Sequence, residues 1–93
     1  VYWWTGSATI ALDRADLQPV WTLPGTQGPG VRYGDAVLVP VRGGLAVVDP
    51  VTGAVTRTTA VDRGGWTGPV QSAVAGSVLL EQRGPDLVAL RPA

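Results

Sequence analysis

Few side chains in this sequence have the type and spacing that catalysis requires. The chain has no histidine, lysine or cysteine, so nothing is available to activate its serines, which are Ser7, Ser72 and Ser77. Asp13 and Asp16 form the only close pair of acids. Calcium prefers six or more oxygen ligands, so we expect this pair to stabilise a turn rather than hold a metal. The sequence therefore predicts a protein that is not an enzyme, with no catalytic residues, no metal site and no cofactor.

A glycine-rich segment and the tryptophans also have structural interpretations. The segment Gly25–Gly30 (GTQGPG) superficially resembles a phosphate loop, but it precedes a predicted strand and lacks the lysine, which favours a plain connector. The tryptophans are expected to fill interfaces between sheets and to cover exposed strand faces. They are Trp3, Trp4, Trp21 and Trp66.

Charge and composition argue against several classes of partner. Seven arginines balance seven acids, so no overall field favours nucleic acid or an anionic membrane. The absence of cysteine excludes disulfides and thiolate metal sites. The longest apolar run has six residues, whereas a membrane helix needs about 20. We expect no nucleic-acid partner and no transmembrane segment.

The elements that must position these residues are β-strands, and the middle of the chain gives the clearest pattern. Ala36–Val41 and Leu45–Val48 are short apolar runs bounded by glycine and proline, which predicts two strands. Gly43 and Gly44 are expected to supply the positive φ angles of the hairpin between them. Ala54–Val61 is polar on both faces, which predicts an exposed outer strand. Because the first two runs are apolar on both faces, we expect them to lie between neighbouring sheets, as in a propeller blade.

The rest of the chain reads as two imperfect copies of this central stretch. A shift of 36 residues places Ile10–Asp13 on Ala46–Asp49, and a shift of 42 residues places Leu87 on Leu45. Periods near 40 residues with strands throughout are typical of propeller repeats. The predicted fold is all-β, with about two and a half four-stranded antiparallel blades. They are an incomplete blade at 1–23, a complete blade at 30–61 and an incomplete blade at 69–91. Because a propeller has 4–8 blades, we expect this one to be incomplete and part of a larger propeller.

The repeat resembles the PQQ-like (BamB-like) β-propeller repeat, in which a strand and a glycine turn are followed by an ALD-type segment, a Thr-Gly turn and a tryptophan. The matching residues are Ala11-Leu12-Asp13 with Trp21, Val47-Val48-Asp49 with Thr52-Gly53, and Val88-Ala89-Leu90. Three positions depart from the pattern. Leu17 replaces the turn glycine in the first copy, Arg57 replaces the tryptophan in the second, and Arg91 replaces the aspartate in the third. In the family that tryptophan packs between blades. Trp21 is expected to do so, whereas the contact at Arg57 must be built differently.

One set of loop residues is predicted to form a binding surface. In blade topology, the connector that leaves an outer strand emerges on the same side as the second hairpin turn. This places five polar or aromatic residues on one rim, namely Gln27, Arg42, Arg63, Trp66 and Arg83. Arginine and tryptophan are enriched in binding hot spots, so we predict an acidic or peptide-like partner. The simpler alternative is that loops carry exposed arginine for solubility.

The resemblance implies a non-catalytic propeller segment that acts as a protein-binding scaffold or sensor, outside the cytoplasm in a bacterial cell envelope. The family also includes quinoprotein dehydrogenases, so one alternative is part of a PQQ-dependent oxidoreductase whose catalytic residues lie in other blades. A second alternative is a fragment whose copies assemble into a closed propeller. The expected partners are a protein or peptide and the remaining blades, on the same chain or another.

Overall fold

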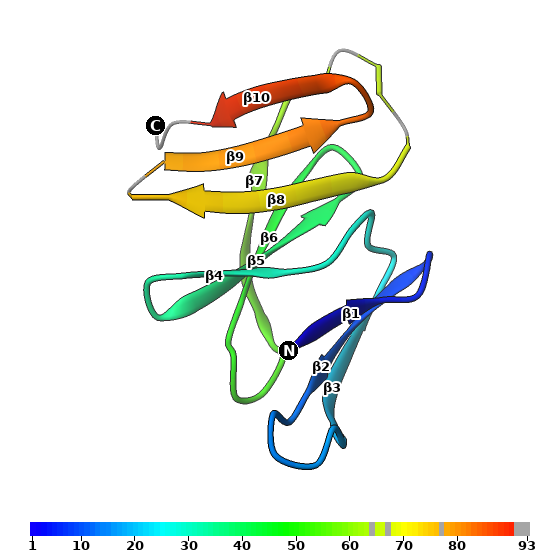
Figure 1. Cartoon of the computed structure of the whole chain (residues 1–93), viewed down its shortest axis with the longest axis vertical. Coiled ribbons are helices and arrows are strands. Elements are labelled where there is room, and N and C mark those ends of the chain that lie inside the picture. Colours follow the sequence, from blue (N-terminus) through cyan, green and yellow to red (C-terminus); the bar gives the residue numbers. More distant parts are fainter. Residues whose placement is uncertain (64, 67, 77, 91–93) are drawn as a thin grey trace.

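The computed structural model describes residues 1–63, 65–66, 68–76 and 78–90, and these residues form three antiparallel sheets (Figure 1). The first sheet contains β1 (Tyr2–Trp4), β2 (Ala8–Leu12) and β3 (Pro19–Pro24). The second contains β4 (Val31–Tyr33), β5 (Ala36–Val41), β6 (Gly44–Val48) and β7 (Val55–Ala60). The third contains β8 (Val70–Ala75), β9 (Val78–Arg83) and β10 (Asp86–Leu90). None of the sheets closes into a barrel, and the prediction of an all-β fold is confirmed.

The two apolar runs in the middle of the chain are β5 and β6, which pair from Val37 with Val48 to Val41 with Gly44. Val37 is fully buried, and Leu38 on the opposite face is half-buried. The turn between the strands is shorter than expected. Gly43 has a positive φ, of 75°, but Gly44 does not. Gly44 already belongs to β6, where a side chain would collide with the backbone of Thr59 on β7.

The outer strand of the second sheet is β7, which pairs with β6 and is exposed along its whole length. Its sequence, VTRTTA, has no apolar face to bury. The prediction of an exposed outer strand is therefore confirmed. Arg57 lies on this strand and is exposed, so it does not take up the packing position of a tryptophan.

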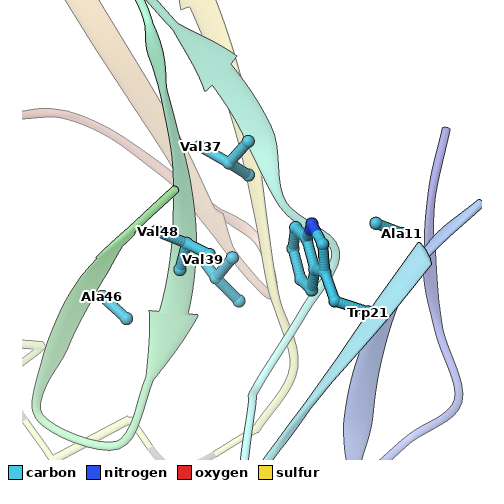
Figure 2. Close-up of a cluster of buried hydrophobic side chains, with 6 residues drawn as sticks. All are labelled: Ala11, Trp21, Val37, Val39, Ala46 and Val48. Carbon is cyan, nitrogen blue, oxygen red and sulfur yellow. The ribbon is translucent and has the colours of Figure 1, made fainter. Parts of the chain in front are cut away.

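The first and second sheets pack face to face around Trp21 of β3 (Figure 2). Figure 2 shows the indole between Ala11 of its own sheet and the valines of the second sheet. Its Nε1 donates a hydrogen bond to the carbonyl of Pro50, at 3.0 Å. Gly53 approaches so closely that a Cβ there would lie 2.6 Å from the Cβ of Trp21. Trp21 thus packs between two sheets, as expected, and needs glycine opposite it.

The turns that follow β2 and β6 are copies of each other. In each turn an aspartate side chain, of Asp13 or Asp49, accepts the N–H two residues further on at 2.8 Å. The same aspartate's carbonyl accepts the N–H four residues on, from Leu17 at 2.8 Å or Gly53 at 2.9 Å. Leu17 has a φ of 58° and Gly53 a φ of 75°. Leu17 therefore occupies a left-handed glycine position, at a cost of about 1–2 kcal/mol.

The sheets span residues 2–24, 31–60 and 70–90, beside the predicted units 1–23, 30–61 and 69–91. Arg91, where the third copy departs from the repeat pattern, lies outside the described residues. Within the described part of the chain, no helix has the length and apolar character needed to cross a membrane.

Candidate binding groove

A groove lies where the first sheet meets the turn between β5 and β6. Its volume is about 400 Å³. Three glycines line it together with Trp4, Ser7, Thr26, Gln27, Arg42 and Pro69. The groove therefore contains two of the predicted binding residues, Gln27 and Arg42.

Backbone hydrogen bonds fix the wall of the groove that carries Gln27. The N–H of Gln27 donates to the carbonyl of Pro40 on β5, at 2.8 Å. The carbonyl of Gln27 accepts from the N–H of Val70 on β8, also at 2.8 Å. The indole Nε1 of Trp4 donates to the carbonyl of Thr26 at 3.2 Å. The connector between β3 and β4 is thus tied to all three sheets.

A buried threonine supports this wall from beneath. The hydroxyl of Thr9 donates to the carbonyl of Gly28 at 2.8 Å and lies 2.8 Å from the hydroxyl of Thr26. Both threonines are buried. Because these polar groups satisfy one another away from water, they hold the connector in one conformation.

Arg42 supplies the only charge among the described residues that line the groove. It occupies the two-residue turn between β5 and β6, and its side chain is exposed. The ion pairs found among the described residues use Arg63 and Arg83, so the guanidinium of Arg42 is not paired with a carboxylate of that part of the chain. Nearby, the Oε1 atom of Gln27 is buried without a hydrogen-bond partner. The groove therefore combines the apolar surface of Trp4 and Pro69 with the positive charge of Arg42.

Arg63 is not an exposed binding residue but a buried connection between the second and third sheets. Its Nε and Nη2 atoms donate to the two carboxylate oxygens of Glu81, at 2.7 and 3.0 Å. Its Nη1 donates to the carbonyl of Val41 at 2.7 Å, and its Nη2 also donates to the carbonyl of Gly44 at 2.9 Å. Every nitrogen of the guanidinium therefore donates a hydrogen bond at the base of the turn that presents Arg42.

Arg83 completes the same cluster. Its Nε donates to Glu81 at 2.6 Å, while its Nη2 is buried without a partner. Burial alone would raise the pKa of Glu81, but hydrogen bonds and charge from Arg63 and Arg83 outweigh that effect and hold the pKa below its ordinary value of 4.5. The carboxylate is thus ionised at neutral pH.

Trp66 lies in the connector before the third sheet and remains exposed. Its Nε1 donates to the carbonyl of Pro69 at 3.1 Å. Its ring covers Gly84 so closely that a Cβ there would lie 2.7 Å from the Cη2 atom of the indole. Trp66 therefore packs over the turn between β9 and β10.

The structure divides the five predicted residues into two groups. Gln27 and Arg42 line the groove, whereas Arg63, Trp66 and Arg83 lie around the start of the third sheet. The two groups adjoin, because Arg63 is bonded to the ends of the turn that carries Arg42. Their role in binding stays a prediction.

Sequence reasoning did not find two residues that matter here. The sequence predicts that Trp4 fills an interface or covers a strand face, and its spacing gives no sign that its indole reaches the Thr26 carbonyl. Glu81 did carry a signal. A shift of 42 residues places it on Val39, which is fully buried, so a charge at that position indicates a buried ion pair.

The remaining candidates have structural roles. Asp13 and Asp16 accept backbone N–H groups within their turn, at 2.8 and 3.0 Å. Gly25–Gly30 precedes β4, as expected, and forms part of the groove wall. Among the described residues, no three acidic side chains gather where they could hold a metal ion.

Comparison of the chain with protein-family models, with curated proteins and with solved structures finds no match.

Proposed function

We propose that this chain is a non-catalytic segment of a β-propeller that binds an acidic peptide segment of a protein partner in the Arg42 groove. The propeller arrangement is supported by three antiparallel sheets of three, four and three strands that repeat in sequence, two of them packed face to face around Trp21. The resemblance of the repeat to the PQQ-like family supports a scaffold or sensor role in a bacterial cell envelope.

The observation that carries the binding proposal is the free charge of Arg42 inside a preformed groove. Trp4 and Pro69 offer apolar surface beside it, and no acidic side chain among the described residues lines the groove. An exposed arginine next to a tryptophan suits a partner that presents a carboxylate with an apolar neighbour. Binding sites for small ligands and peptides are commonly of this preformed kind.

Binding is tested by titrating the protein into a fluorescein-labelled peptide rich in aspartate and glutamate and recording fluorescence anisotropy. The Arg42→Ser variant is expected to bind about tenfold more weakly, which corresponds to about 1.4 kcal/mol. Arg57→Ser is the matched control, because Arg57 is an exposed arginine on β7, away from the groove. Binding should also weaken with salt, since exposed charges are screened.

Two results would contradict the proposal. One is an equal loss of affinity in the Arg42 and Arg57 variants, which would mean that the peptide responds to the net charge of the protein and not to the groove. The other is equal binding of a peptide in which asparagine and glutamine replace the acids, which would remove the carboxylate as the recognised group.

A further inference from the structure

One face of the third sheet carries buried charged groups, and the register of its strands identifies the side chains that share this face. Ser72 on β8 pairs with Glu81 on β9. Val70 pairs with Arg83 two residues further along, so all four side chains lie on the same face. Val70 and Glu81 are fully buried. The Nε atom of Arg83 donates to Glu81 at 2.6 Å, so the guanidinium extends along this face towards the row of Ser72 and Glu81.

The positive charge in this cluster exceeds the negative charge. The guanidinium groups of Arg63 and Arg83, whose side chains are 3% and 11% exposed, share the single carboxylate of Glu81. Arginine stays protonated inside proteins, so the cluster does not become neutral by losing a proton. Asp86 pairs with Arg83 from β10 but is exposed, and both ion pairs found among the described residues use Glu81. Because a buried unpaired charge is costly, the cluster favours one more negative charge.

Two hydrogen-bonding atoms on the same face have no partner among the described residues. They are the Nη2 atom of Arg83 and the Oγ atom of Ser72, and both are buried. Every nitrogen of the Arg63 guanidinium, by contrast, donates a hydrogen bond. Buried polar groups in proteins are almost always paired. A group that accepts hydrogen bonds from both atoms would satisfy them, and an anion would also balance the extra charge.

We propose that the third sheet binds a small inorganic anion, such as chloride, between the Nη2 atom of Arg83 and the Oγ atom of Ser72. The burial of both atoms favours a monatomic ion over a bulky one. A bound anion neutralises the second guanidinium, so the stability of the fold depends on the anion concentration. Neither residue lines the Arg42 groove, so the inference is independent of the peptide binding proposed above.

Urea unfolding in sodium chloride and in sodium gluconate, at equal ionic strength and neutral pH, tests the inference. Gluconate is too bulky for the buried site, and equal ionic strength keeps general screening the same. Chloride at about ten times its dissociation constant is expected to lower the equilibrium constant for unfolding about tenfold relative to gluconate, and the effect should saturate. Broadening of the chloride NMR line by the folded protein measures binding directly.

Two variants locate the site. Ser72→Ala removes the hydroxyl donor and should weaken chloride binding about tenfold, since a hydrogen bond to a charged group is lost. Arg83→Met removes the charge and should abolish the chloride effect. Ser72→Ala keeps every charged group, so it answers the question even where Arg83→Met does not fold. The matched control is Gln71→Ala, at an exposed residue on the opposite face of β8, and it should keep the full chloride effect.

Two results would overturn the proposal. One is equal stability of the unmodified protein in chloride and in gluconate, which would mean that uncharged water satisfies these atoms. The other is an equal chloride effect in the Ser72 and Gln71 variants, which would assign the ion to another part of the protein. Peptide binding at Arg42 is measured separately and should survive Ser72→Ala, so failure of either idea leaves the other testable.

Discussion

The carboxylate of Glu81 is completely buried and accepts hydrogen bonds from two nitrogens of Arg63, at 2.7 and 3.0 Å. Glu81 lies on β9, and Arg63 follows β7, so this pair joins the third sheet to the second. Between the first and second sheets the corresponding contact is made by the indole of Trp21. That a contact between blades differs at Arg57 stays a prediction; the structure shows that a buried ion pair joins the second and third sheets.

Removing one partner of this pair should destabilise the fold strongly. Arg63→Met leaves the buried Glu81 with only Arg83, and we expect the free energy of unfolding to fall by about 3–5 kcal/mol. The double variant Arg63→Met/Glu81→Leu should be less destabilised than Arg63→Met alone, since it leaves no uncompensated carboxylate. Urea unfolding curves measure both. Arg57→Ser, an exposed arginine, is the control, and equal losses for Arg63 and Arg57 would contradict the structure.

The same pair should make stability depend on pH. The pKa of Glu81 is lowered in the folded state, so its ionised form favours folding. This contribution is complete above the ordinary value of 4.5 and is lost as the pH falls below 4.5 and through the lowered pKa. Glu81→Gln should remove this part of the acid dependence, as seen in unfolding curves recorded at several pH values. An unchanged pH profile in that variant would assign the acid sensitivity to other groups.

Replacing Leu17 by glycine should stabilise the protein, although glycine usually does the opposite. Leu17 is exposed and holds a φ of 58°, which glycine adopts without steric cost. We expect a gain of about 1 kcal/mol, after allowing for the greater freedom of glycine in the unfolded chain. Val51→Gly in the equivalent turn is the control and should lower the melting temperature, because Val51 has no positive φ to relieve. A loss of stability in the Leu17 variant would contradict the turn equivalence.

Alanine at Gly53 should be much more damaging than alanine at Gly25. The two glycines have nearly equal φ angles, of 75° and 73°. A Cβ at position 53 would lie 2.6 Å from Trp21, whereas a Cβ at position 25 meets nothing within 4 Å. Both variants lose about 1–2 kcal/mol from backbone strain, and Gly53→Ala should lose a further 1–3 kcal/mol from overpacking. Comparable melting temperatures for the two would mean that Trp21 does not press against this turn.

Much of the secondary structure follows from local sequence, because glycine and proline separate the apolar runs at regular intervals. The strand pair around Val37 was predictable from its apolar runs, and the exposed strand around Arg57 was predictable from its polarity on both faces. The extent of the turn was not. A rule that considers only neighbouring residues assigns Gly43 and Gly44 alike to the turn. The close approach of the Thr59 backbone shows that Gly44 belongs to the strand.

The candidate site was predictable only in part, because it depends on contacts between distant residues. Topology was enough to suggest that Gln27 and Arg42 lie at the same end of the molecule. It did not reveal that Arg63 is buried, since nothing near Arg63 in sequence shows that a carboxylate 18 residues away will meet it. The 42-residue repeat held that information at Glu81, where a charge falls on the position of an apolar core residue.

The first and second sheets are joined by an indole and the second and third by an ion pair, and this difference restricts how the repeats can be exchanged. The Trp21 contact depends on shape and on one hydrogen bond, so the neighbouring sheet must supply a glycine at the position of Gly53 and a carbonyl at that of Pro50. The Glu81 contact depends on charge, and a third sheet placed beside another neighbour would keep Arg83 but lose Arg63, which leaves the buried carboxylate with one arginine instead of two. The order of the sheets is therefore specified by two different kinds of contact, and exchanging neighbouring repeats would disrupt both.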